Sequence, residues 1–528
     1  MKNAAKYIRF LSFSLTTFLL IACLAFLLIQ SRWDRSSELD NAAAFKQGTI
    51  GTEIMPHPVF VALPGIFPEL FQPRGVQGGE WHEQFGMSKE AEGKQEMPTG
   101  FFLSNKRPKS GAPSPVEFVG ISCVMCHSTE VRKPNGDVQL VVGPGNSSLN
   151  LFAWIDAFQT AVLDERLNFD SVKQQYEEKT AKKISFAQKI MIIAWLKQTR
   201  KKIREGTQKY GDPFHGKEVF LASNVPTGPG RTQPFRTLVR RLLDRPGTDM
   251  RVYTKISSVF HQDRREWAQV DGSIRDLYAR SSVAAYAAGA TVQNMRHPDI
   301  VRNIRSASDF TRNLDAPSFA EMFPELAPDL DGALVKEGRK VYSVHCASCH
   351  GYPTNDNNLS KDGWVDGKYH GDIVPYEKIG TDAERVTFRR FEELPEKIVD
   401  EFPSGHPFEF SREDIRPGPS GETVGYINAP IERAYLRAPY FHNASVLTLS
   451  ELINLEKRRE VFYRGQNMYD PKRIGLESPN EPTEKIYFRF DTKVQGNSNA
   501  GHDYPWQFDS PDRDENALKS LLEYLKTI

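Results

Sequence analysis

Cysteine is scarce in this chain: five among 528 residues are too few for the disulfide scaffold of a small secreted protein. An excess of charge of one sign is also lacking, because 68 Lys and Arg stand against 67 Asp and Glu. The formal charge of +1 gives no support for a nucleic-acid-binding protein, so we expect no nucleic-acid partner. Hydrophobic residues make up 39% of the chain, which is typical of folded domains rather than of wholesale disorder.

One long uncharged run stands near the N-terminus. Residues 10–30 are mostly apolar, and twenty residues of helix span about 30 Å, the thickness of the bilayer core. Three cations precede the run, so we expect residues 1–9 to be a cytoplasmic tail and 10–30 a transmembrane anchor in contact with membrane lipid. This predicts a single-pass protein of the inner (cytoplasmic) membrane with its domains in the periplasm. The alternatives are a cleaved signal peptide and a lipoprotein carrying lipid on Cys23.

The rest of the chain alternates loop-rich stretches with helical patterns. Residues 31–100 are rich in Gly, Pro and charge and predict a loop-rich lead-in. Apolar residues at helical spacing predict four helices, which cover residues 150–164, 185–204, 331–346 and 515–526. We expect a boundary near residue 328, with a first domain over 101–328 and a second over 329–528.

Two C-x-x-C-H motifs use every cysteine outside the apolar run, at residues 123–127 and 346–350. Two cysteines at this spacing can form thioethers to both vinyl groups of one haem, and the His that follows can bind its iron. The sequence therefore predicts two covalently bound haem c groups. The residues predicted to attach them are Cys123, Cys126, Cys346 and Cys349, and the predicted proximal iron ligands are His127 and His350.

Disulfides and zinc are the alternative interpretations of the four cysteines. A disulfide within each pair does not explain why a His follows both pairs. A zinc site would join pairs that are far apart in the sequence, and it would also leave both histidines unexplained. Haem attachment is therefore the preferred interpretation.

The sixth ligand of each iron separates an electron carrier, which fills that position with Met or His, from an enzyme, which leaves it open. The candidates for the second haem are His370, His406, His442, Met468 and His502. His442 lies among aromatic residues in the stretch 438–446, whereas we expect His502 to cap a loop. No candidate stands close to the first motif, which favours an open first iron. The remote candidates there are Met191, His215, Met250, His261, Met295 and His297.

As a set, these features resemble the bacterial di-haem cytochrome c peroxidase superfamily and, within it, the rubber-oxygenase-like branch. The resemblance covers about residues 100–528. Besides the two haem motifs, the matching stretches include residues 228–231, 315–318, 379–382, 438–445 and 496–502.

The resemblance implies a mainly α fold, with two cytochrome c-like haem domains and long loops behind the transmembrane helix. In the peroxidases the N-terminal haem reacts with peroxide, and the C-terminal haem passes electrons to it. In the rubber-oxygenase-like branch the first haem can bind dioxygen, and the residue equivalent to His442 ligates the second haem. The chain lacks the distal His that peroxidases carry soon after the first motif, and it has no Met at 455–457. Both departures point away from an ordinary peroxidase.

Two functions follow from these expectations. The first is an oxidoreductase that activates peroxide or dioxygen at the first haem, with electron transfer through the second. The alternative is a non-catalytic, membrane-tethered electron-transfer cytochrome. Both need a redox donor or acceptor protein as partner. Trp267, Phe310 and Phe319 are candidates to line a distal pocket, although we expect each to serve the core.

Overall fold

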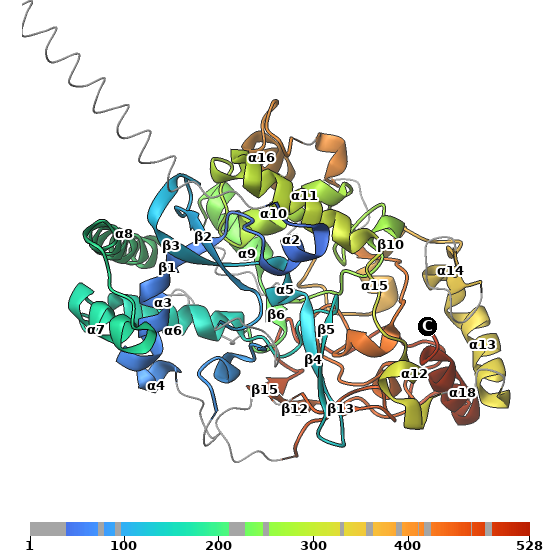
Figure 1. Ribbon diagram of the computed structural model, residues 1–528. Coiled ribbons are helices and arrows are strands. Elements are labelled where there is room, and N and C mark those ends of the chain that lie inside the picture. The colour runs from blue at the N-terminus through green and yellow to red at the C-terminus, as the bar shows by residue number, and fades with distance from the viewer. Residues whose placement is uncertain are drawn as a thin grey trace, which may run out of the picture.

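The structure is a computed structural model, shown in Figure 1, and it describes twelve stretches of the chain. These are residues 38–71, 79–89, 97–210, 227–245, 253–327, 332–354, 363–386, 393–409, 411–416, 424–465, 467–480 and 488–528. The predicted tail at 1–9 and the predicted anchor at 10–30 lie outside them.

The expected membrane topology is corrected by the described helices, none of which is long and apolar enough to cross a bilayer. Helix α8 (Phe186–Tyr210) is the longest of them, but lysines and arginines interrupt its apolar residues. The prediction of a single-pass inner-membrane protein with periplasmic domains is corrected to this extent: the described residues contain no membrane-spanning helix.

The prediction of a mainly α fold was also wrong. Helices make up 42% and strands 15% of the described residues, so the fold is mixed. Apart from β2 (Phe101–Lys106) and β3 (Pro113–Ile121), the described strands are two to five residues long. Most pair as separate two-stranded antiparallel ribbons. Strands this short show too little alternation of apolar and polar residues for the sequence to indicate them.

A three-stranded antiparallel sheet in the order β1-β3-β2 organises the N-terminal part, with β1 at Glu53–Pro56. Apolar side chains of the sheet and of nearby helices form one core. Those helices are α3 (His57–Ile66), α4 (Pro68–Phe71), α6 (Leu151–Leu163), α7 (Phe169–Thr180) and α8. Because β1, α3 and α4 fall within residues 31–100, the expected loop-rich lead-in is corrected in its described part. The apolar run of α3 lacks a clear helical period and contains Pro64. For these two reasons the sequence did not predict this helix.

A second core joins helices from both predicted domains. Its helices are α9 (Pro234–Leu243), α10 (Leu277–Ala287), α11 (Pro298–Arg312) and α16 (Leu394–Glu401). Residues of α16 thus pack with helices from before position 328. The short helix α2 (Asn41–Gln47) packs against α11, and Figure 1 shows the two helices side by side.

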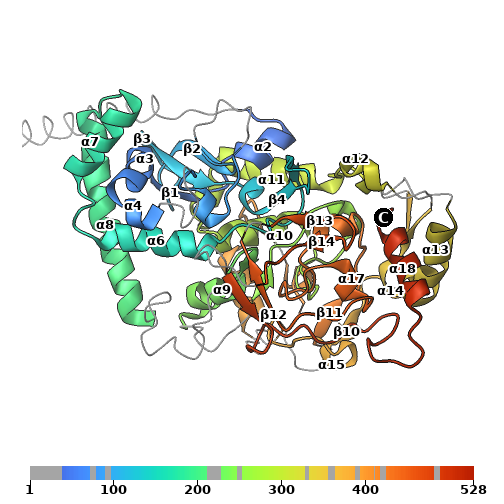
Figure 2. The ribbon, with the colours of Figure 1, turned by 90° about the horizontal axis from the view of Figure 1, so that it is seen from below.

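A third core surrounds the contacting helices α13 (Ala333–His345) and α18 (Glu515–Leu525). It also includes Val131 and Val141 from the hairpin of β4 (Ser128–Arg132) and β5 (Val138–Val142). Two-stranded ribbons make up much of the C-terminal part, and Figure 2 shows several of them. They are β8 (Tyr352–Pro353) with β9 (Trp364–Val365), β10 (Ile373–Pro375) with β11 (Gly425–Ile427), β12 (Val461–Arg464) with β15 (Phe488–Asp491), and β13 (Tyr469–Asp470) with β14 (Gly475–Leu476).

The four helices predicted from apolar spacing are confirmed as α6, α8, α13 and α18. Side-chain caps fix where two of them begin. Asn150 accepts a hydrogen bond from the backbone N–H of Ala153 at the start of α6, and Asp514 caps α18. The leucines of α18 that follow helical spacing are buried, as expected for an amphipathic helix.

Candidate functional site

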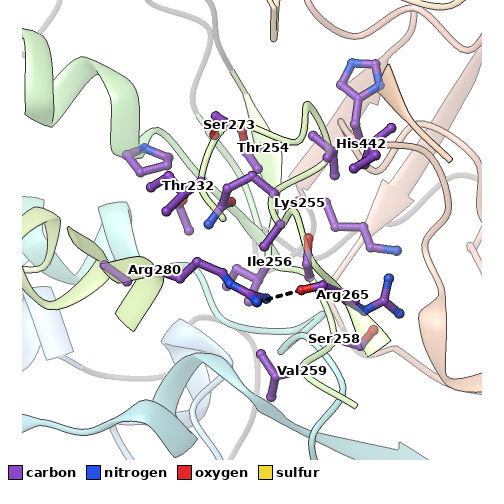
Figure 3. Close-up of a pocket in the computed structure, with 18 of the residues that line it drawn as sticks. Thr232, Thr254, Lys255, Ile256, Ser258, Val259, Arg265, Ser273, Arg280 and His442 are labelled. Carbon is purple, nitrogen blue, oxygen red and sulfur yellow. Dashed lines mark hydrogen bonds between the residues drawn. The ribbon is translucent and has the colours of Figure 1, made fainter. Parts of the chain in front are cut away.

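A cavity of about 1260 Å³ lies within the described part of the chain. Ordinary small-molecule pockets enclose about 300–1,000 Å³, so this cavity has room for more than one such ligand. Figure 3 shows part of its wall, formed by β6 (Arg231–Thr232), β7 (Thr254–Lys255) and the segments after them. Both C-x-x-C-H motifs open onto it, through Cys123, Cys126, His127, Cys346, Cys349 and His350. The fold therefore brings together two motifs that are far apart in the sequence.

The first motif begins helix α5 (Cys123–Cys126) directly after β3. The hydroxyl of Ser122 fixes this turn by donating to the carbonyls of Lys46, at 2.7 Å, and Gly100, at 3.2 Å. Gly100 has φ +92°, and a Cβ there would lie 2.4 Å from the Cα of Met125. Only glycine permits that approach, so the chain before β2 passes tightly against α5.

None of the four motif cysteines forms a disulfide. Burial raises the pKa of Cys123 to about 12, that of Cys126 to about 11 and that of Cys346 to about 12. In the part of the chain that the structure describes, no group of three or more His, Cys, Asp or Glu side chains could hold a metal ion by itself. Two cysteines beside one imidazole, repeated at two places in one cavity, form a donor set that fits haem c.

The imidazole of His127 is held in one orientation. Its Nδ1 lies 3.0 Å from the carbonyl oxygen of Ser257, to which it donates. Burial lowers the pKa of His127 to about 4, so the ring is neutral at pH 7 and Nε2 is the nitrogen left with a lone pair. Histidines that bind metals commonly donate their other ring N–H to a carbonyl in this way.

The second motif repeats this arrangement with different neighbours. It lies in α14 (Ala347–His350), after the end of α13. The Nδ1 of His350 donates to the carbonyl of Ala429 at 2.8 Å, and burial lowers the pKa of the ring. Two distant backbone carbonyls thus hold the two motif histidines in the same tautomer, which leaves Nε2 of each ring able to bind iron.

A second histidine faces His350 across the cavity. The ring centroids of His350 and His502 lie 6.2 Å apart, with 49° between the ring planes. Two imidazoles on opposite sides of one metal ion, each bound at about 2.0 Å, have ring centres roughly 6 Å apart. Burial lowers the pKa of His502 to about 3, and its Nδ1 has no hydrogen-bond partner among the described residues. His502 thus lies close enough to His350 for both rings to bind one iron, whereas the sequence favoured a loop-capping role for it.

His442, the predicted distal ligand, also lines the cavity but has another neighbour. Its Nε2 lies 3.1 Å from the hydroxyl of Tyr426, and the two rings stack with centroids 4.5 Å apart. Burial, with a smaller contribution from Arg385, lowers the pKa of His442 to about 3. These contacts favour His502 over His442 as the partner of His350.

The other histidines and methionines proposed from the sequence stand away from the cavity or outside the described residues. His370, His406, Met468, Met191, His261, Met295 and His297 do not line the cavity. His215 and Met250 lie outside the described residues. No described methionine lines the cavity, which leaves the position opposite His127 without a methionine ligand among the described residues. Of the three aromatic candidates, Trp267 lines the cavity, whereas Phe310 and Phe319 pack in cores.

The two motifs differ in their distance from the surface. In α5 the side chains of Val124 and Met125 are 2% and 1% exposed. In contrast, Ser348 in α14 is exposed, and Val344, one turn before it, is 74% exposed. Both ribbon views place α13 and α14 at an outer edge of the molecule (Figures 1 and 2). The second motif is therefore the one that another protein can approach.

Comparisons with known proteins find chains of similar sequence, but they give no activity for those proteins. No family model matches the chain. Uncharacterized protein y4iM of Sinorhizobium fredii is 29% identical over 312 residues, which cover 52% of this chain and 64% of that protein. Uncharacterized protein y4iJ of the same organism is 23% identical over 570 residues, covering 91% of this chain and 90% of that protein. The chain thus matches less than two thirds of y4iM and most of y4iJ.

Proposed function

We propose that the chain is a di-haem c-type oxidoreductase, related to the di-haem peroxidase superfamily and its rubber-oxygenase-like branch, with both haem groups in the cavity. One observation carries this proposal: both C-x-x-C-H motifs open onto one large cavity, and a backbone carbonyl holds Nδ1 of each motif histidine. A disulfide or a buried core histidine needs neither feature. The four cysteines attach the haem groups, and His127 and His350 are the proximal ligands.

The two haem sites have different tasks in this proposal. A haem c exchanges single electrons and, where its iron has an open position, binds peroxide or dioxygen. His350 and His502 would both hold the iron of the second haem, and a haem held in this way would supply electron transfer. The first site has His127 on one side and no described methionine on the other, which suits binding of an oxidant.

The chain's own residues support this division. The first motif lies among buried side chains, since Val124 and Met125 of α5 are 2% and 1% exposed. The second motif lies near the surface, where a redox donor protein can approach it. Trp267 stands in the wall of the same cavity, with the guanidinium of Arg416 4.3 Å from its ring centre. The second motif thus lies nearer to the surface than the first.

The experiment that tests this proposal is low-temperature electron paramagnetic resonance of the resting ferric protein, with both haem groups attached. We expect one low-spin haem from the second site and a high-spin signal from the first. Peroxide or a small anion should change the high-spin signal alone. Two low-spin signals that neither reagent changes would reject the oxidoreductase and favour the alternative, a non-catalytic electron-transfer cytochrome.

A further inference from the structure

Six cations stand in the wall of the cavity: Lys255, Arg265, Arg280, Arg437, Lys378 and Arg416. Figure 3 labels the first three around the pocket. The fully buried Glu432 pairs with two of them, 2.8 Å from Arg265 and 3.2 Å from Arg437. Burial lowers the pKa of Lys255 to about 7 and that of Arg280 and Arg437 to about 10. Positive charge in this low-dielectric wall therefore favours an anionic ligand in the cavity.

Lys255 belongs to the segment that orients the first motif. It stands two residues before Ser257, whose carbonyl accepts the hydrogen bond from His127. Its ammonium donates to the carbonyls of Arg437 and, at 2.9 Å, Pro439. An ammonium has three N–H donors, so two carbonyls leave one donor for a ligand in the cavity.

Arg265 and Arg437 belong to the segments around the second motif. Arg265 donates to the carbonyl of Pro430 at 3.2 Å. Pro430 follows Ala429, whose carbonyl holds the ring of His350. The two segments come together at the backbone of Arg437, whose carbonyl accepts a hydrogen bond from the ammonium of Lys255.

We propose that Lys255, Arg265 and Arg437 form a cationic bridge that binds propionate groups of both haem groups and couples the two haem sites electrostatically. This inference rests on the proposed function, because the propionates arrive with the haem groups. Each haem c carries two propionates, and a charge-assisted hydrogen bond to a carboxylate is roughly twice as strong as a neutral one. A shared cation favours the reduced state of both irons, since reduction removes one positive charge nearby.

The test is a spectroelectrochemical titration of the full, haem-loaded chain carrying Lys255→Met. We expect the midpoint potentials of both haem groups to fall, shifting the reduced-to-oxidised ratio at a fixed applied potential at least tenfold for each. A tenfold shift corresponds to 59 mV for a one-electron couple. Lys255→Arg keeps the cation and should restore both potentials. Unchanged potentials in Lys255→Met, or a fall at one haem alone, would overturn the bridge.

Lys368→Met is the matched control, because it removes an exposed lysine next to the second motif that does not line the cavity. Solvent screens that charge, so both potentials should stay at their wild-type values. An equal fall in this control would overturn the inference, because removing any lysine would then have the same effect. Haem staining of the denatured proteins separates the two proposals: a chain without covalent haem contradicts the proposed function itself, whereas a loaded chain with unshifted potentials contradicts the bridge alone.

Discussion

Replacing His502 by Ala gives the sharpest test of the second site. The wild-type ring centre lies 6.2 Å from that of His350, which is the separation of two imidazoles on one iron. Removing the imidazole takes away one strong-field ligand and leaves space for a small molecule in its place. The second iron should therefore change from low-spin to high-spin, while the ligands of the first iron are untouched.

The size of this effect follows from the number of sites. Each chain holds two predicted haem groups, so half of the haem iron should move from the low-spin to the high-spin signal in His502→Ala. Electron paramagnetic resonance, supported by the visible absorption spectrum, measures this fraction. Adding imidazole should restore the low-spin signal, because the free ligand fits the space that the side chain left.

His442→Ala is the control for this prediction, because His442 lines the same cavity but contacts Tyr426. That variant should keep the wild-type spin states. If His442→Ala converts half of the iron and His502→Ala converts none, the ligand assignment drawn from the ring geometry is wrong and the original expectation for His442 is right. A His502→Ala protein whose second haem stays low-spin would refute the assignment even without the control.

Three further predictions concern stability, each measured by urea unfolding. Burial lowers the pKa of His442 from 6.5 to about 3, so only the unfolded chain binds a proton at this residue as pH falls below 6.5. His442 alone should therefore lower the free energy of unfolding by about 2 kcal/mol between pH 6.5 and 5. His442→Gln should remove this contribution from the total loss of stability. Gly100→Ala should destabilise the fold by at least about 1–3 kcal/mol, because φ is +92° and the new Cβ would clash with Met125; an unchanged midpoint would contradict the tight turn. Leu521→Ala should cost about 2–5 kcal/mol, since its side chain is fully buried between α18 and its neighbours, whereas the exposed Leu334→Ala on α13 should change little.

The long helices could be predicted because their apolar residues repeat with helical spacing, as Leu518 and Leu521 do in α18. The three-stranded sheet could not be predicted in this way. Its β1 strand comes from a segment that looked like loop, and the ribbons are too short to carry a pattern. The cores were equally hidden, since α16 packs with helices from the other side of the expected boundary near 328. Contacts of that kind depend on tertiary packing, which local spacing does not record.

The motif residues were visible in the sequence because C-x-x-C-H is a local pattern with a chemical meaning. The carbonyls of Ser257 and Ala429 that hold the two histidines carry no sequence signal, since every residue has a carbonyl. The choice between His442 and His502 also depended on three-dimensional contacts. The aromatic residues around His442 in the sequence made it the predicted ligand. In the structure, Tyr426 holds its ring by a hydrogen bond.

The measurement that tests the central claim most directly is the mass of the intact, denatured chain after production in cells that attach haem c. We predict a mass greater than that of the polypeptide by two haem groups, and one group fewer in each of the double variants Cys123→Ala/Cys126→Ala and Cys346→Ala/Cys349→Ala. The haem should stay with the protein through acid extraction, since thioether bonds hold it. A polypeptide mass without haem, or haem lost on extraction, would contradict the proposal that the two motifs attach haem covalently.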